Sequence, residues 1–189
     1  MDKLSDCIIN KDSSYIPIWF MRQAGRYLPE FRKIRQQNQN FIKLCLNPKL
    51  VNDITLQPIK RFNLDATIIF SDILMVPYGL GQNVEFKKGY GPMLEDFNLD
   101  KLLQIKPKDF IKKLSPVYEA INKVKQTIKE ESLIGFVGAP WTLLVYMLNK
   151  QSPKKDFNFN KISRDKVFIN KLLKKIQESL CLHIDKQVE

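Results

Sequence analysis

The 189-residue sequence has little of the residue types that build zinc sites and disulfide frameworks. Its only histidine is His183, and its three cysteines, Cys7, Cys45 and Cys181, lie far apart with no CxxC pair. These absences argue against a structural metal and against a disulfide-stabilised fold. The chain also has no apolar run of about 18 residues and no hydrophobic leader segment, so we expect a soluble, cytoplasmic protein that does not bind membranes.

Motifs that bind nucleotides or form catalytic triads are also missing. Gly79 and Gly81 form a Gly-x-Gly pair, but the third glycine of a dinucleotide fingerprint is absent. There is no Walker loop and no Ser-His-Asp arrangement. The net charge of +11 could indicate a nucleic-acid partner, but the lysines are scattered along the whole chain instead of forming a stripe. We therefore predict no nucleic-acid binding.

Arginine is the scarce cation, with only six residues among the 31 lysines and arginines. Four of the six, Arg22, Arg26, Arg32 and Arg35, nevertheless fall within one short window. A guanidinium is a planar fork that binds a carboxylate or phosphate through two hydrogen bonds, which an ammonium cannot do. The window therefore predicts an oxyanion-binding site. The alternative, an exposed basic helix face, accounts for Arg32 and Arg35 better than for Arg22 and Arg26.

The hydrophobic pattern predicts helices that alternate with short buried strands. Apolar runs near 65–70 and 133–137 have the pattern of parallel strands that are covered on both faces. A small hairpin is expected around 84–92, and the polar residues 1–14 are expected to be disordered. We expect Pro58 to end or kink its helix. The predicted helices start at or near the following residues: Pro29, Pro48, Pro116, Pro140 and Ser163. This order predicts an α/β fold with a parallel sheet.

Polar or glycine-rich residues follow both predicted strands. Asp72 comes after the first strand and Gly138 after the second, and parallel α/β folds build their sites at this end of the strands. Asp72 is thus a candidate functional carboxylate, and the alternative is that it caps the following turn. Near an arginine cluster its pKa would be lowered, which keeps it ionised. Tyr146 has the helical position of a core or half-buried residue.

Three segments of the chain resemble one known family. The segment 21–32, MRQAGRYLPEFR, is similar to the signature of the uroporphyrinogen decarboxylases, and the segments 70–74 and 135–143 agree with the same family in order and spacing. The resemblance extends over nearly the whole chain from Ile16 onward. It implies a (β/α)8 barrel, of which residues 1–189 form a single partial domain, the N-terminal part, with about two barrel strands.

The resemblance implies an activity in heme biosynthesis. The family removes the four acetate carboxyls of uroporphyrinogen III to give coproporphyrinogen III, without a metal or an organic cofactor. The substrate carries eight carboxylates, which gives a physical reason for an arginine cluster. The implied substrate-binding residues are Arg22, Gln23, Ala24, Gly25, Arg26, Arg35, Asp72 and Tyr146.

Two of these residues have an implied catalytic role. Asp72 accepts hydrogen bonds from the pyrrole N–H groups and stabilises the cation that forms when a pyrrole carbon is protonated. Arg22 is a candidate for delivering the proton. The family is usually a homodimer.

The length of the chain sets an expectation about activity. A complete eight-stranded barrel needs about 250 residues, so we expect an N-terminal fragment that is inactive by itself. Two alternatives remain open at this point. One is a barrel relative that transfers methyl groups from corrinoid or thiol carriers, and the other is a non-catalytic basic binding module.

Overall fold

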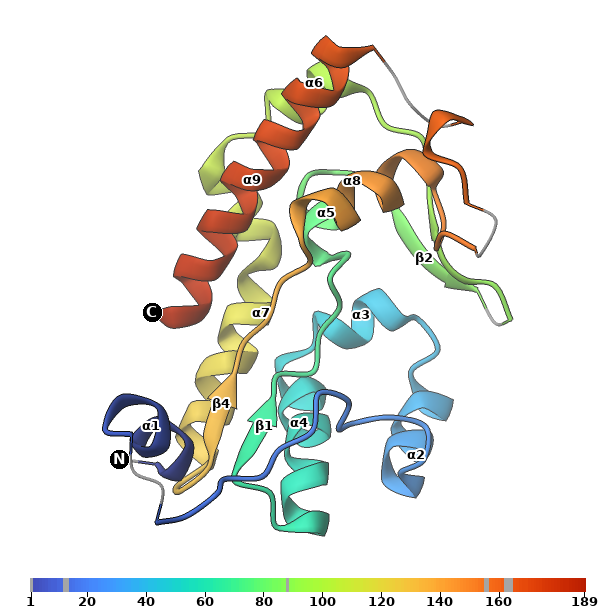
Figure 1. The fold of residues 1–189 in the computed structure, drawn as a ribbon. Helices are drawn as coiled ribbons and strands as arrows, with labels where there is room; N and C mark the ends of the chain where they lie inside the picture. Colours follow the sequence, from blue (N-terminus) through green and yellow to red (C-terminus); the bar gives the residue numbers. More distant parts are fainter. Residues whose placement is uncertain (1, 12–13, 88, 155–156, 162–164) are drawn as a thin grey trace. The chain divides into compact units, whose positions relative to one another are not determined.

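A computed structural model describes residues 2–11, 14–87, 89–154, 157–161 and 165–189 (Figure 1). The chain forms two compact units. The first unit contains Met1–Gln39, Lys43–Ser71 and Pro116–Phe136. The second unit contains Asn40–Ile42, Asp72–Ser115 and Val137–Glu189.

The first unit holds the two strands that the sequence predicts for the barrel. Strand β1 (Ala66–Ile68) pairs in parallel with β4 (Ser132–Ile134), in the register Ala66 to Ser132. Helix α4 (Pro48–Phe62) packs against β1, and α2 (Pro29–Gln37) packs against α4 (Figure 1). The prediction of parallel pairing is confirmed, and β1 is mostly buried as expected, whereas the three residues of β4 are only half-buried.

Helix α4 continues through Pro58 to Phe62, so of the two predicted outcomes, an end or a kink at Pro58, the end is wrong. Tertiary packing explains the difference. Thr55 is fully buried, its carbonyl accepts a hydrogen bond from the Thr67 hydroxyl at 2.7 Å, and its own hydroxyl accepts one from the Phe70 N–H at 3.0 Å. These bonds fix the helical turn before the proline to the β1 segment.

Helix α7 (Pro107–Thr127) begins nine residues before Pro116, so the prediction that Pro116 opens it is also wrong. A proline inside a helix leaves the carbonyl four residues earlier without its usual donor. Here the hydroxyl of Ser115 donates to that carbonyl, on Lys112, at 3.0 Å. The buried side chains of Leu114 and Val117 continue the apolar face across the proline.

The N-terminal segment also differs from expectation, because it contains helix α1 (Lys3–Ile9). The carboxylate of Asp2 caps this helix by accepting a hydrogen bond from the Ser5 N–H at 3.0 Å. The hydroxyl of Ser132 at the start of β4 also donates to Asp2. The polar composition of this segment did not indicate a helix. Part of the support for the helix start comes from Ser132, which is distant in the sequence.

The second unit is built on the long helix α9 (Lys166–Val188), whose N-cap is Asp165. Helices α5 (Met75–Gly79), α6 (Leu99–Leu103) and α8 (Pro140–Asn149) all pack against α9 (Figure 1). The expected helix start at Pro140 is confirmed. The expected start at Ser163 lies outside the described residues. The fully buried side chains of this unit include Phe110, Leu143, Leu144, Met147 and Leu172.

The predicted hairpin is present in the second unit. Strands β2 (Val84–Lys87) and β3 (Gly91–Leu94) pair in an antiparallel register, and Met93 makes a further bridge to Gln151. A 3-10 turn, η1 (Phe159–Lys161), follows in the connection to α9. Lys88 of the expected turn lies outside the described residues.

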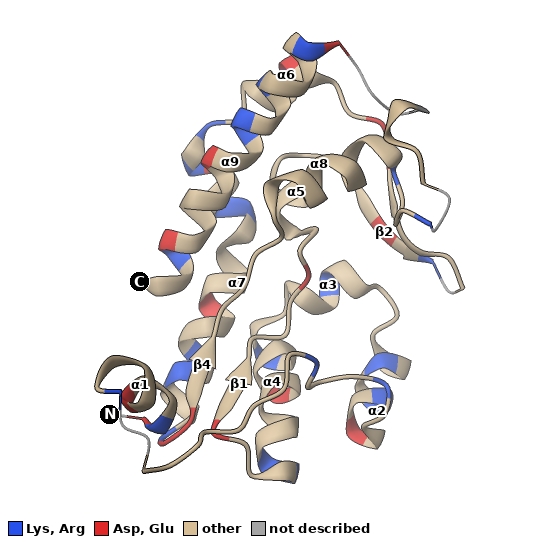
Figure 2. Cartoon of the chain, viewed as in Figure 1, with Lys and Arg blue, Asp and Glu red and all other residues tan. Residues whose placement is uncertain are grey.

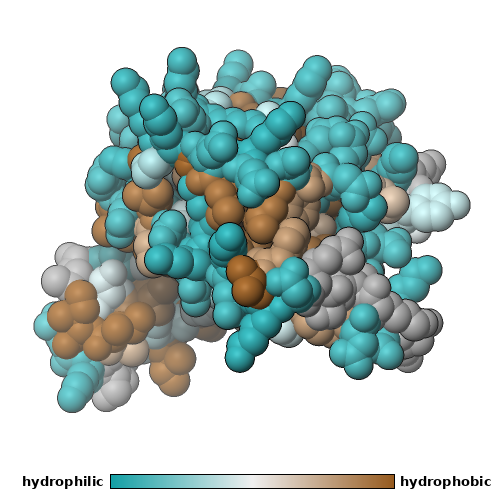
Figure 3. All heavy atoms as spheres, turned by 90° about the horizontal axis from the view of Figure 1, so that it is seen from above, coloured by the Kyte–Doolittle hydropathy of each residue, from teal (hydrophilic) through white to brown (hydrophobic). Residues whose placement is uncertain are grey.

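The surface carries the excess of lysine without gathering it in one place. Figure 2 shows basic residues along α7 and α9 and also on α1, α2, α4 and α6, whereas α5 and α8 carry none. Hydrophilic side chains cover most of the face drawn in Figure 3, with a smaller group of apolar side chains among them. Within the described part of the chain, no helix combines the length and the apolar character needed to cross a membrane.

Candidate functional site

The first part of the arginine window, with Arg22 and Arg26, is a loop of the first unit that leads into α2, and Arg32 lies on that helix. Gln23 lies at the centre of the loop and is buried, and its side-chain amide bonds to β1. The loop closes through a turn in which the Leu28 N–H donates to the Gly25 carbonyl at 3.0 Å. Arg22 and Arg26 lie on the two sides of Gln23, Ala24 and Gly25, and both are exposed.

Two arginines of the window are bound to backbone carbonyls. Arg32 donates from Nη1 to the carbonyl of Arg26 at 3.0 Å. Arg35 donates from Nη1 to the carbonyl of Gln39 at 3.1 Å and also to that of Asn38, just after α2 ends. A cation in this position stabilises a helix C-terminus. The structure therefore shows a structural role for Arg35, which the sequence had placed among the substrate-binding residues.

Arg22 and Arg26 differ from the other arginines of the first unit. Arg61 forms a two-point ion pair with Glu30, at 3.0 and 2.9 Å. The guanidinium groups of Arg22 and Arg26 have no hydrogen bond or ion pair with any residue that the structure describes. Two planar forks on one ordered loop are thus available for an anionic ligand.

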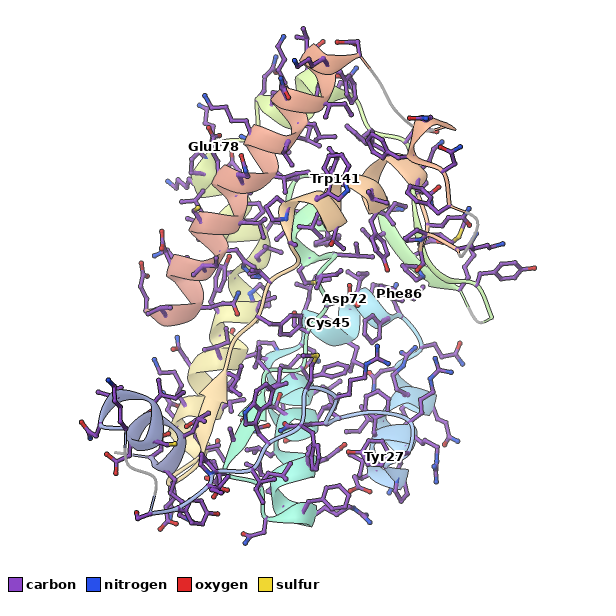
Figure 4. All side chains as sticks on the ribbon, in the orientation of Figure 1. Tyr27, Cys45, Asp72, Phe86, Trp141 and Glu178 are labelled. Carbon is purple, nitrogen blue, oxygen red and sulfur yellow. The ribbon has the colours of Figure 1, made fainter. Side chains whose placement is uncertain are left out.

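Asp72 follows β1 along the chain and belongs to the second unit (Figure 4). Its Oδ1 accepts a hydrogen bond from the Leu74 N–H at 2.8 Å, so it does cap the turn that leads into α5. The carboxyl is partly buried, and this burial raises its pKa from 3.8 to about 6, against the lowering effect of the Leu74 N–H. The expected lowering by nearby cations is therefore wrong, although Asp72 remains mostly ionised at pH 7. A carboxyl perturbed in this way is a candidate for function.

Tyr146 is half-buried on α8, also in the second unit. Its hydroxyl lies 3.1 Å from the Ser152 Oγ, which satisfies the polar end of the side chain. The structure thus places Arg22, Arg26 and Arg35 in the first unit and Asp72 and Tyr146 in the second.

Gly138 makes a close contact that sequence reasoning missed. A Cβ atom at this position would lie 3.0 Å from the Cβ of Ile73 and 2.8 Å from the Cδ2 of Leu143. The segment that follows β4 therefore packs directly on the residue next to Asp72. The glycine after the second predicted strand was the available signal, but only the fold shows which residue it faces.

Replacing Gly138 with alanine is expected to destabilise the second unit by about 1–3 kcal/mol, because Ile73 Cβ cannot move without its backbone. Chemical denaturation of the 189-residue chain measures the change. Gly25→Ala is the matched control, since a Cβ there would meet the Tyr27 ring at an ordinary 3.6 Å. Equal stability of the two variants would contradict the proposed packing.

Other site types find little support in the described residues. One hollow of the second unit has a volume of about 560 Å³ and lies between the start of α8 and α9. Its lining is mostly apolar and includes Gly138, Pro140, Leu180 and Cys181, but no predicted site residue. Within the described ranges, no three His, Cys, Asp or Glu side chains are grouped so that they could hold a metal ion.

Comparison with known proteins identifies the family. A family model described as uroporphyrinogen decarboxylase (URO-D) matches residues 1–189. The chain belongs to the uroporphyrinogen decarboxylase family. The uroporphyrinogen decarboxylase of Rickettsia felis is 45% identical over 187 residues, which are 96% of this chain and 53% of the relative. That of Rickettsia massiliae is 47% identical over 180 residues, 92% of this chain and 51% of the relative. The chain thus spans about half the length of the curated relatives it matches.

A comparison of structures gives the fold class. A methyltransferase from Methanosarcina mazei superposes with a TM-score of 0.72 over 98% of this chain and 54% of that protein, at 15% sequence identity. At this identity the likeness concerns the fold alone. The chain has the (β/α)8-barrel fold in part, with β1 and β4 as its two barrel strands. The sequence matches favour the decarboxylase family over the methyltransferase alternative.

Proposed function

We propose that this chain serves in the decarboxylation of uroporphyrinogen III to coproporphyrinogen III in heme biosynthesis. The observation that carries the proposal is the pair of exposed guanidinium groups on Arg22 and Arg26, which have no ionic partner among the described residues. Their loop is held by hydrogen bonds at Gln23, Gly25 and Arg26. A substrate with eight carboxylates supplies the anions that such forks bind in pairs of hydrogen bonds.

In this proposal Asp72 acts on the reacting ring. Among the described residues its carboxylate has one hydrogen-bond donor, the Leu74 N–H, and it can accept further bonds from pyrrole N–H groups. Protonation of a pyrrole carbon makes the ring a cation, which the carboxylate stabilises. The bond between the acetate CH2 and its carboxyl carbon then breaks, CO2 leaves, and the electron pair neutralises the ring. A second proton converts the CH2 into a methyl group, and the first proton then leaves the ring carbon, which restores the pyrrole, so that one proton is consumed for each CO2 released.

The remaining predictions belong to the same proposal. Arg35, Tyr146 and the backbone of Gln23, Ala24 and Gly25 complete the proposed binding set, and Arg22 is the candidate for delivering the proton. The family resemblance supports a single barrel domain that contains both units, a homodimer and a cytoplasmic location. It also supports a reaction without metal or cofactor.

A chimera tests the proposed function. This chain replaces the matching half of the Rickettsia felis enzyme, and coproporphyrinogen is measured by fluorescence after oxidation and chromatography. We expect the chimera to convert uroporphyrinogen III, because 45% identity over 187 residues preserves the fold at the join. The 189-residue chain alone is measured in parallel and is expected to be inactive. A folded chimera that leaves uroporphyrinogen unchanged would overturn the proposal.

A further inference from the structure

The side chain of Gln23 occupies the place of a neighbouring strand on β1. Its Nε2 donates to the Ala66 carbonyl at 2.8 Å, and its Oε1 accepts from the Ile68 N–H at 3.0 Å. The side chain is 5% exposed, so water cannot easily replace these bonds. One amide therefore satisfies two backbone groups that a third strand would otherwise meet.

The other edge of β1 confirms this geometry. Strand β4 bonds to residues 65 and 69, through Ser132 N–H to the Asp65 carbonyl and Ile69 N–H to the Ile134 carbonyl, each at 3.0 Å. Along a strand the backbone groups of alternate residues point to opposite edges. Ala66 and Ile68 therefore face away from β4, and Gln23 binds them on that far side.

Only an amide of this length fits both partners. Glutamate has no donor for the Ala66 carbonyl and would set a carboxylate against it, whereas asparagine is shorter by one methylene. Methionine keeps the length and the apolar volume but leaves both β1 groups without partners. The carbonyl of Gln23 is also engaged, because the Tyr27 hydroxyl donates to it. The side-chain amide and the backbone carbonyl of Gln23 thus both form hydrogen bonds within the protein.

Gln23 is the immediate neighbour of Arg22 and lies three residues before Arg26. Arg32, on α2, donates a hydrogen bond to the Arg26 carbonyl at 3.0 Å. The backbone is thus fixed beside each free guanidinium, while the guanidinium groups themselves make no such bond to described residues. A loop that is ordered before binding loses less conformational entropy when the ligand arrives.

We infer that Gln23 is a positioning residue, which sets the arginine loop on the edge of β1 so that Arg22 and Arg26 are preorganised for a polycarboxylate. This inference rests on the proposed function. In this role Gln23 affects binding only by positioning Arg22 and Arg26. Its side chain could contact the substrate directly only if its two hydrogen bonds to β1 broke.

The test is a double-mutant cycle on the affinity for uroporphyrin, a fluorescent probe with eight carboxylates. Gln23→Met in the otherwise unchanged 189-residue chain is expected to weaken binding roughly tenfold. In the Arg22→Ala, Arg26→Ala background the same change is expected to have no further effect, because there is nothing left to position. Gln36→Met, an exposed glutamine on α2, is the control and should leave affinity unchanged. The cycle is repeated in the chimera with KM as the readout.

Hydrogen exchange at the Ile68 amide separates the possible results. It should be protected in the wild type and exchange faster in Gln23→Met, which tests the clamp without any ligand. If the arginine variants bind uroporphyrin normally, the proposed function fails. If they lose binding but Gln23→Met retains it, or if Gln23→Met weakens binding equally in both backgrounds, the positioning role fails.

Discussion

Replacing Asp72 with asparagine is expected to abolish most of the activity of the chimera while making the protein more stable at pH 7. Asparagine can still accept the Leu74 N–H, so the turn before α5 should persist. The negative charge that would stabilise the protonated ring is lost, which typically lowers kcat by roughly 100-fold or more. Activity and stability should therefore change in opposite directions, as expected for a functional charge whose burial costs stability.

The pH dependence gives the sign of the stability change. Burial raises the pKa of Asp72 from 3.8 to about 6 in the folded chain. Between these values the folded state holds a proton that the unfolded state releases, so the Asp72 contribution to stability is lost as pH rises. Above pH 6 the buried charge costs about 2–3 kcal/mol, allowing for some solvent screening. The asparagine variant does not carry this cost at pH 7 and should match the wild type near pH 3.8.

His183 acts in the opposite direction over the same pH range. Burial lowers its pKa from 6.5 to about 4, so its contribution to stability is lost as pH falls between these values. The two contributions nearly offset each other in the wild type. The decisive quantity is therefore the difference in unfolding free energy between wild type and Asp72→Asn at each pH, measured by urea denaturation. Asp100→Asn, an exposed carboxylate of the same unit, is the control. A difference that does not vary with pH would contradict the raised pKa.

Removing both free guanidinium groups, with Arg22→Ala and Arg26→Ala together, is expected to weaken uroporphyrin binding by more than about 100-fold. Each arginine can donate two charge-assisted hydrogen bonds to one carboxylate. When the guanidinium is removed, that carboxylate has only water as a hydrogen-bond donor. The two lysine replacements, Arg22→Lys and Arg26→Lys, keep the charge and lose the fork, so they should recover only part of the affinity.

Fluorescence titration at two salt concentrations measures this effect. Lys33→Ala removes one positive charge, as each single arginine change does, from an exposed site on α2 and serves as the control for general electrostatics. Coproporphyrin, which has four carboxylates fewer, should show a smaller loss on the same substitutions. If Lys33→Ala weakens binding as much as the arginine changes do, the chain is a basic binding surface and the specific site is refuted.

Several elements could be read from the sequence because they depend on local rules. Proline at a first helical turn located α2, α4 and α8, and short apolar runs located β1 and β4. Two other prolines were misread. Pro58 lies inside α4, where the Thr55 carbonyl accepts a hydrogen bond from the Thr67 hydroxyl. Pro116 lies inside α7, where the Ser115 hydroxyl donates to the Lys112 carbonyl. Such bonds depend on packing and on side-chain rotamers, which composition does not reveal.

The sequence by itself determined the family, because the arginine window and its two companion segments keep their order and spacing. It could not assign a task to each arginine. Only the tertiary structure separated Arg22 and Arg26, whose forks are free among the described residues, from Arg35, which closes the end of α2. Only the tertiary structure showed that the Gln23 side chain bonds to β1 and that burial raises the pKa of Asp72. The physical reason is that partners and desolvation come from residues that are distant in the sequence.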